Sequence, residues 1–173
     1  PIAALRELHT ARQIDPTRAE SHYLTGFVYM GRHNYSEAVV NLRKALELKP
    51  KLYEARNALA ACYMSLKRWR DAIDAVEPLL DDPLNPSPWL AHNNAGWSHF
   101  EIGNRNRAVH HLKTSVFLNG KFCLGLLNLG TVQKHYGQID QARLYLEQAR
   151  RKCPKHPPTL LQLGEVYEML RRH

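Results

Sequence analysis

The sequence has no apolar run close to the ~20 residues that a membrane-spanning helix needs. It also lacks a glycine-rich phosphate loop and the HExxH pattern of zinc peptidases, and its 10 histidines show no metal-ligand spacing. A catalytic cysteine needs a histidine close in space, and the sequence indicates no such pairing. We therefore expect a protein that is not an enzyme and that holds neither a metal nor a cofactor.

Charge of one sign is in excess: 24 Lys and Arg stand against 16 Asp and Glu, which gives a net charge of +8. No basic stripe is interleaved with stacking aromatic residues, so nucleic acid is not the expected partner. The excess is typical of a solvated basic face, and a docking surface for an acidic partner or an anionic membrane is the alternative. The length of 173 residues and the hydrophobic share of 44% suffice for a sizeable core.

An internal repeat is present, and it is clearest in residues 19–50. Small residues recur at spacings that let two antiparallel helices approach closely, and a proline follows where the second helix must end. In a 34-residue unit counted from residue 19, position 8 is Gly26, position 11 is Tyr29, positions 20 and 27 are Ala38 and Ala45, and position 32 is Pro50. This is the spacing of the tetratricopeptide repeat (TPR).

The pattern recurs along the chain and predicts an all-α fold, a single TPR array that forms a right-handed superhelical solenoid of helical hairpins. The first full unit should hold helices over about residues 19–32 and 35–48. A lone helix cannot bury its apolar face, so we expect further chain upstream. The predicted parts are 1–16 as the second helix of a truncated repeat, 19–52, 53–88, 89–122 and 123–156 as full repeats, and 157–173 as a terminal half-repeat or capping helix.

The concave face of such an array is lined mostly by first helices, and here it carries an unusual share of apolar and aromatic residues. We expect a groove for an apolar helix or extended segment of a partner protein, in which two asparagines bond the partner's backbone. The alternative is that neighbouring repeats or the terminal helix bury these side chains. The candidate groove residues are Tyr23, Phe27, Met30, Asn57, Met64, Asn93, Trp97 and Phe100.

The chain has three cysteines, of which Cys123 and Cys153 stand at positions 1 and 31 of the fourth repeat. In an antiparallel hairpin these positions lie side by side, so a disulfide is geometrically plausible and would contribute roughly 3 kcal/mol by loop-closure entropy. Two reduced cysteines at the ends of the hairpin are the alternative. Cys62, at a normally buried position, should belong to the core.

One stretch goes beyond the TPR pattern: DPLNPSPW at residues 82–89, followed by NNAGW at residues 93–97. This stretch resembles the type IV pilus pilotins, the PilF and PilW proteins, and most closely the branch of the gliding-motility protein Tgl. The resemblance implies lipoproteins on the inner face of the outer membrane, which help secretin subunits reach that membrane and assemble into the pilus pore. The lipid-bearing cysteine of that family has no counterpart here, and a periplasmic location would favour the disulfide.

The sequence therefore predicts a non-catalytic, pilotin-like adaptor in pilus biogenesis and motility. Its partner would be the pilus secretin, at the periplasmic face of the bacterial outer membrane, and it would meet the membrane only through a lipid anchor outside this chain. One alternative is a cytoplasmic TPR scaffold that joins parts of another complex. The other is a TPR appendage of a larger enzyme.

Overall fold

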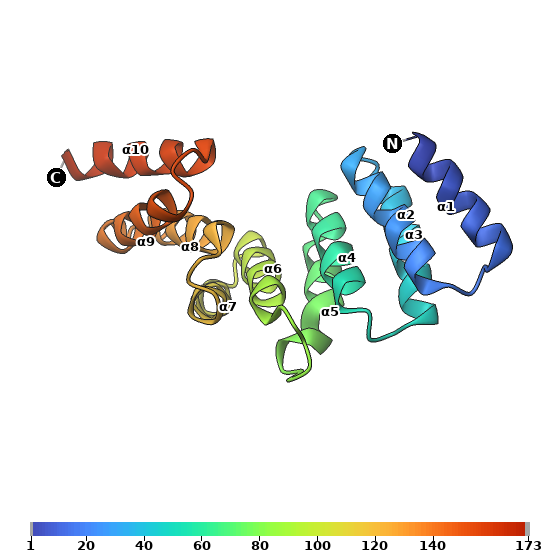
Figure 1. The fold of residues 1–173 in the computed structure, drawn as a ribbon. Helices are drawn as coiled ribbons and strands as arrows, with labels where there is room; N and C mark the ends of the chain where they lie inside the picture. The colour runs from blue at the N-terminus through green and yellow to red at the C-terminus, as the bar shows by residue number, and fades with distance from the viewer. Residues whose placement is uncertain (1, 172–173) are drawn as a thin grey trace. The chain divides into compact units, whose positions relative to one another are not determined.

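Helical hairpins follow one another along the computed structural model, which describes residues 2–171 (Figure 1). Over those residues there are ten helices and no strand. Within the same range, no helix is both long enough and apolar enough to cross a membrane. The chain divides into two compact units, Pro1–Pro86 and Ser87–His173, and each is described by itself. The charged end of the predicted cap, at Arg172 and His173, lies outside the described residues.

Unit 1 contains one single helix and two hairpins. Helix α1 packs on α2, and the pairs α2–α3 and α4–α5 form the hairpins. The second hairpin follows the first directly, as the repeat pattern predicts. The helices are α1 (Ile2–Ile14), α2 (Ala19–Gly31), α3 (Tyr35–Leu48), α4 (Tyr53–Ser65) and α5 (Trp69–Leu80).

Unit 2 contains two hairpins and a final helix. The pairs α6–α7 and α8–α9 form the hairpins, and α10 packs on α9 and α8. Leu163 and Val166 of α10 are buried with Leu127, Ala142 and Leu146, so α10 covers the core of the second hairpin. The helices are α6 (Pro88–Glu101), α7 (Arg105–Leu118), α8 (Cys123–His135), α9 (Ile139–Lys152) and α10 (Pro157–Arg171).

Every hairpin turns through a residue in the left-handed backbone region at position 15 of its repeat. Gly103 and Gly137 have φ of 80° and 74°, which glycine adopts without strain. In unit 1 the same position is occupied by His33 and Lys67, with φ of 58° and 57°, and for these residues the conformation costs about 1 kcal/mol. The two turns of unit 1 therefore use residues that disfavour the left-handed conformation, and the helices on either side keep the backbone in it.

Close helix contact inside a hairpin depends on a small residue at position 8. A Cβ atom added at Gly26 would lie 2.7 Å from Cγ of Leu42, and one added at Gly130 would lie 2.6 Å from Cγ of Leu146. The leucines at position 24 fill this space and are fully buried, as are the alanines at position 20. The sequence pattern at positions 8, 20 and 24 is thus the packing interface between the two helices.

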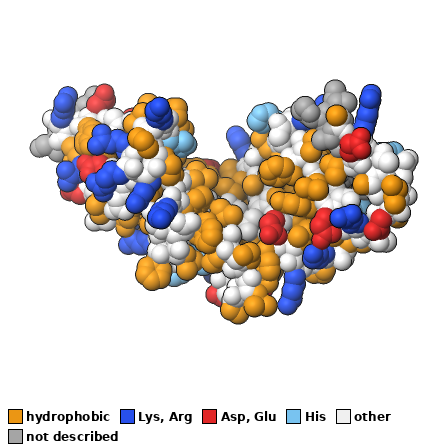
Figure 2. Space-filling view, viewed as in Figure 1, with side chains coloured by type: hydrophobic (Ala, Val, Ile, Leu, Met, Phe, Trp, Pro, Cys, Tyr) orange, Lys and Arg blue, Asp and Glu red, His pale blue; other side chains and the backbone are white. Residues whose placement is uncertain are grey.

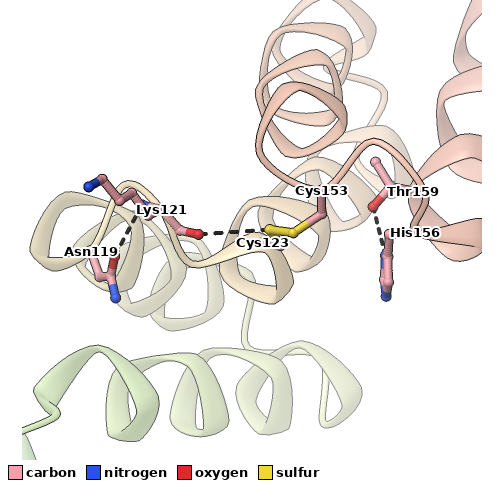
Figure 3. The surroundings of a disulfide bond; sticks show 6 residues. All are labelled: Asn119, Lys121, Cys123, Cys153, His156 and Thr159. Atoms are coloured by element: carbon pink, nitrogen blue, oxygen red, sulfur yellow. Dashed lines mark hydrogen bonds between the residues drawn. A yellow bond between two sulfur atoms is a disulfide. The ribbon is translucent and has the colours of Figure 1, made fainter.

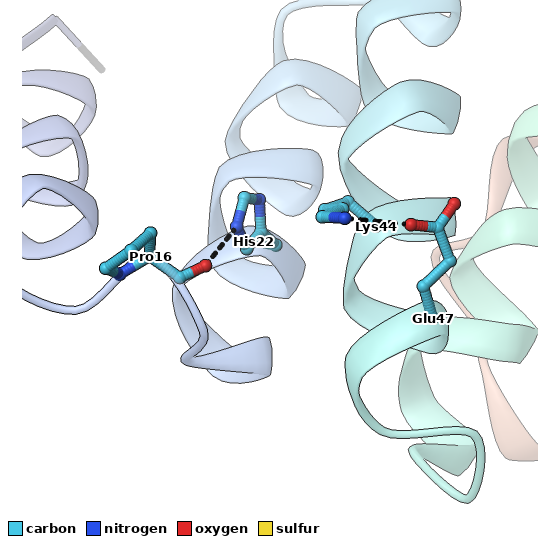
Figure 4. Close-up of polar contacts among 4 residues, drawn as sticks. All are labelled: Pro16, His22, Lys44 and Glu47. Carbon is cyan, nitrogen blue, oxygen red and sulfur yellow. Dashed lines mark hydrogen bonds and ion pairs between the residues drawn. The ribbon is translucent and has the colours of Figure 1, made fainter.

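Polar contacts at the surface of unit 1 add little to its stability. His22 Nε2 lies 3.3 Å from the carbonyl oxygen of Pro16, beside the turn between α1 and α2 (Figure 4). Lys44 donates to Glu47 over 3.0 Å on the exposed side of α3. Exposed ion pairs of this kind contribute about 1 kcal/mol or less, so the buried contacts described above dominate.

Candidate protein-interaction face

The predicted groove residues of unit 1 lie along α2 and at the equivalent place on α4. Phe27 is 58% exposed, and its ring centroid lies 6.4 Å from that of Tyr23. Met30 and Met64 are half-buried, and α2 and α4 are in contact. We refer to Tyr23, Phe27, Met30 and Met64 as the α2–α4 face.

Acidic side chains adjoin this face. Burial raises the pKa of the Tyr23 hydroxyl, and the nearby Glu54 carboxylate raises it further. Glu20, at the start of α2, accepts from Lys49 over 2.8 Å, so its charge is already paired. In the half of Figure 2 that holds α1–α5, hydrophobic side chains gather in one area with acidic side chains beside them. The α2–α4 face is thus apolar, with the carboxylate of Glu54 near Tyr23.

The two asparagines expected to bond a partner's backbone are buried instead. Asn57 donates from Nδ2 to the carbonyl oxygen of Tyr53, 3.3 Å away on its own helix. Asn93 is 2% exposed, and its Oδ1 accepts from Nδ2 of Asn128 on α8 over 2.9 Å. This amide pair joins α6 to α8 and so connects the two hairpins of unit 2. Both residues serve internal packing in this structure.

Trp97 and Phe100 on α6 are half-buried and belong to the packing of unit 2. Their ring centroids are 5.3 Å apart, and both pack against the buried cluster of Leu112, Leu129 and Val132. Phe100 also meets the rings of two residues at the end of α8, His135 at 5.0 Å and Tyr136 at 6.0 Å. Each side chain thus keeps only part of its surface for a partner.

Sequence reasoning missed a histidine cluster between α6 and α7. Nδ1 of His92 lies 3.0 Å from Nδ1 of His111, and the ring of His99 stacks on that of His111 at 5.5 Å. Burial, followed by the neighbouring His92, His99, His110 and Arg107, lowers the pKa of His111 to about 4. The repeat pattern carried a signal for this cluster. His92 and His99 stand at positions 4 and 11 of the first helix and His111 at position 23 of the second, and these positions face one another inside a hairpin.

The part of the pilotin-like motif that belongs to unit 1, residues 82–86, is held by hydrogen bonds to α4 and α5. Asp82 accepts from the backbone N–H of Leu84 and from the hydroxyl of Tyr53, each over 2.9 Å. Asn85 is buried and donates from Nδ2 to the carbonyl oxygen of Leu79 over 3.0 Å. That carbonyl has no helical N–H partner four residues on, because the residue there is Pro83. The loop's asparagine therefore replaces the hydrogen bond that its proline removes.

Cys123 and Cys153 form a disulfide across the ends of the α8–α9 hairpin (Figure 3). Their Cα atoms are 6.2 Å apart, within the usual range for bridged cysteines. Local contacts fix the chain on both sides: Asn119 accepts from the N–H of Lys121 over 3.1 Å, and His156 lies 2.9 Å from the hydroxyl of Thr159. The remaining cysteine, Cys62, is buried, and burial raises the pKa of its thiol to about 12.

Comparison with known proteins bears on the fold. Residues 29–91 match the family model of the tetratricopeptide repeat. Among solved structures, that of PilW, a widely conserved type IV pilus biogenesis factor, superposes with a TM-score of 0.87 at 21% identity and covers 96% of this chain and 76% of PilW.

PilF of Pseudomonas aeruginosa has a TM-score of 0.80 at 21% identity, with coverage of 93% of this chain and 74% of PilF. YrrB, a TPR protein with an unusual peptide-binding site, has a TM-score of 0.69 at 17% identity and covers 95% of this chain and 84% of YrrB. This chain has the TPR fold. No curated protein is similar enough in sequence to count as a match.

The TPR fold is typically non-catalytic and presents surfaces to other proteins. Over the described residues there is no group of three or more His, Cys, Asp or Glu side chains that could hold a metal ion. Apart from the buried Asn57 and Asn93, the predicted contact residues remain candidates, and the most exposed of them, Phe27, lies on the α2–α4 face.

Proposed function

We propose that this chain is a pilotin-like adaptor, which binds the pilus secretin and assists its localisation and assembly in the outer membrane during type IV pilus biogenesis. The observation that carries the proposal is the anchored loop at residues 82–89 set in a TPR frame. It is the stretch in which the sequence resembles the pilotins. The similarity in fold to PilW and PilF supports the proposal over nearly the whole chain.

The α2–α4 face is the proposed docking surface for a secretin segment. Phe27 projects from it and would be covered by an apolar side chain of the partner, while Glu54, near Tyr23, would favour a basic residue on the segment. Because Asn57 and Asn93 are engaged internally, recognition here rests on side chains. Trp97 and Phe100 form a second and separate candidate contact on unit 2.

The disulfide supports an oxidising compartment, since such bonds are rare in the bacterial cytosol and common in the periplasm. We therefore place the adaptor at the periplasmic face of the outer membrane in this proposal. Attachment to the membrane would come from a lipid anchor outside this chain.

The first test is secretin assembly in cells that lack the gene. Secretin multimers that resist detergent are separated from monomers on an unboiled gel, with and without the gene restored. Loss of the multimer in the deletion strain and its return on complementation are the expected result. An unchanged multimer would refute the pilotin function.

The second test addresses the docking surface. Phe27→Ser removes an exposed ring that would bury about 100 Å² against a partner, which amounts to about 2 kcal/mol or a 30-fold weaker complex. Val40→Ser is the matched control, because Val40 is 62% exposed on α3 of the same unit and lies outside the face. Equal secretin binding by both variants would rule out the α2–α4 face while leaving the adaptor function standing.

A general TPR scaffold is the second candidate, and the similarity to YrrB favours it because that protein binds peptides through the same fold. The full-length gene separates the candidates. A signal peptide that ends in a lipidated cysteine supports the pilotin. Its absence favours a cytoplasmic scaffold, and a long catalytic region downstream identifies a TPR appendage of an enzyme.

A further inference from the structure

A polar pocket of about 410 Å³ lies in unit 2, between α7 and the α8–α9 hairpin. The described residues that line it include two cations, Arg105 and Lys113, and no carboxylate. The guanidinium of Arg105 lies 4.5 Å from the centre of the Tyr136 ring, and neither cation forms an ion pair within the described part of the chain. Asp140, the nearby carboxylate at the start of α9, lies 3.6 Å from a guanidinium nitrogen of Arg143 instead. The pocket therefore carries positive charge that its own surroundings do not neutralise.

A buried amide also lines this pocket. Gln133 of α8 is 6% exposed, and its side chain forms no hydrogen bond with the residues that the structure describes. A buried polar side chain normally has such a partner. Gln133 stands at position 11 of its repeat, where three other repeats have a tyrosine: Tyr29, Tyr63 and Tyr167. The exchange of a ring for an amide leaves a donor and an acceptor at the pocket, both available to a ligand.

The equivalent pocket of unit 1 is smaller, at about 310 Å³, and its charges are paired. There the guanidinium of Arg68 lies 4.7 Å from the centre of the Tyr63 ring and donates to Asp71 over 2.9 Å. Arg68 and Asp71 stand at positions 16 and 19 of their repeat. In unit 2 these positions are Gln138 and Gln141, which also line the pocket. Unit 1 therefore satisfies its pocket internally, whereas unit 2 has amides at all three places.

We propose that the pocket of unit 2 binds an extended, acidic segment of a partner protein. Arg105 and Lys113 are 8 residues apart on α7, which places them about 12 Å apart along the helix axis. In an extended peptide, residues i and i+4 lie on one face about 13 Å apart, so carboxylates at that spacing would meet both cations. The glutamine amides both donate and accept, as the peptide backbone between the carboxylates requires. Because the pocket shares no residue with the α2–α4 face, this inference does not depend on the proposed contact with the secretin.

Isothermal titration calorimetry at about 50 mM salt tests the proposal, because low salt preserves contacts between charges. The probe is a capped peptide with glutamates at positions i and i+4 and only serine and glycine elsewhere. We expect saturable binding of one peptide per chain, and binding at least tenfold weaker when glutamines replace both glutamates. Lys113→Gln should weaken binding about fivefold, since it removes one charge contact. Arg43→Gln is the matched control: Arg43 occupies the same position, 25, in the pocket of unit 1 and should leave binding unchanged.

Gln133→Tyr tests the pocket itself, because it installs the residue that unit 1 has at position 11. It should weaken peptide binding at least tenfold, and a thermal melt shows whether the variant is folded. If it does not fold, Lys113→Gln still decides, since Lys113 is exposed.

Four results would overturn the proposal. The first is no peptide binding by the parent chain, and the second is undiminished binding by a folded Gln133→Tyr variant. The third is an equal loss in Lys113→Gln and Arg43→Gln, which would indicate attraction to the basic surface in general. The fourth is displacement of the peptide by an equal concentration of inorganic phosphate, which would make this a site for a free anion.

Discussion

Acidification should destabilise unit 2 through the imidazole of His111. This ring is half-buried between α6 and α7, and burial is the main reason that its pKa lies at about 4. A proton on it would face His92, His99 and His110 and the guanidinium of Arg107, with no carboxylate among the groups that shift its pKa.

The size of the effect follows from the two protonation states. In the unfolded chain a histidine titrates near pH 6.5, so between that pH and about 4 the unfolded state binds more protons than the folded one. The free energy of unfolding therefore falls as the pH falls through this window, and the contribution is fully present only above pH 6.5. At pH 5 the shift corresponds to about 2 kcal/mol, which solvent access to the half-buried ring reduces to about 1 kcal/mol.

Urea unfolding followed by tryptophan fluorescence measures this loss. In a Trp69→Phe background the remaining tryptophans, Trp89 and Trp97, both lie in unit 2, so the signal reports on that unit. The free energy of unfolding is compared at about pH 7.5 and about pH 5 for the parent and for His111→Gln. His9→Gln, on the exposed side of α1, is the control.

The parent should lose free energy of unfolding between about pH 7.5 and about pH 5. His111→Gln should reduce that loss by about 1 kcal/mol, whereas His9→Gln should leave it unchanged. If His111→Gln and the parent lose the same free energy on acidification, the cluster does not hold a depressed pKa. The explanation from burial would then be refuted.

Four residues give three further predictions. Reduction of Cys123–Cys153 should lower the free energy of unfolding by about 3 to 4 kcal/mol, from the loop entropy of a separation of 30 residues. Gly130→Leu should destabilise the α8–α9 hairpin by about 3 kcal/mol, since its Cβ alone would lie 2.6 Å from Leu146, and loss of protection in hydrogen exchange should be confined to that hairpin. Lys67→Gly should raise the melting temperature, because it relieves a left-handed backbone worth about 1 kcal/mol.

Each of these predictions has a result that contradicts it. Titration of the unfolded, unreduced protein should find one thiol, that of Cys62, and three thiols would exclude the bridge. An α8–α9 hairpin that tolerates leucine at residue 130 would show that helix approach there does not depend on glycine. For the turn, Lys67→Ala is the control, and equal stabilisation by alanine and glycine would argue against backbone strain.

The helices could be predicted from the sequence because one repeat fixes its own hairpin. Positions 8, 20 and 24 pack on each other within the same unit, so Gly26, Ala38 and Leu42 indicate where two helices meet. The predicted bounds of 19–32 and 35–48 agree with α2 and α3 to within one residue. The TPR fold and the all-helical class are confirmed by the family match and by the solved structures.

The site was harder to predict because it depends on contacts between repeats. Asn93 stands at a position that lines the groove in a generic repeat. In this chain Asn128 of the next repeat lies beside it and donates from Nδ2 to its Oδ1. Trp97 likewise packs into a core that its own repeat only partly supplies. The histidine cluster combines residues 19 apart on two helices, and one helix viewed alone shows only isolated histidines.

The disulfide also determines how the second half of the chain would respond to mechanical tension. Force that enters at Cys123 leaves at Cys153 through the covalent bridge, so α8 and α9 carry none of it. Pulling on the ends of an oxidised chain would therefore extend it by about 100 Å less than pulling on a reduced one, since the 30 residues between the sulfurs stay closed. In a chain under tension from both ends, this hairpin would therefore bear no load while its neighbours are stretched.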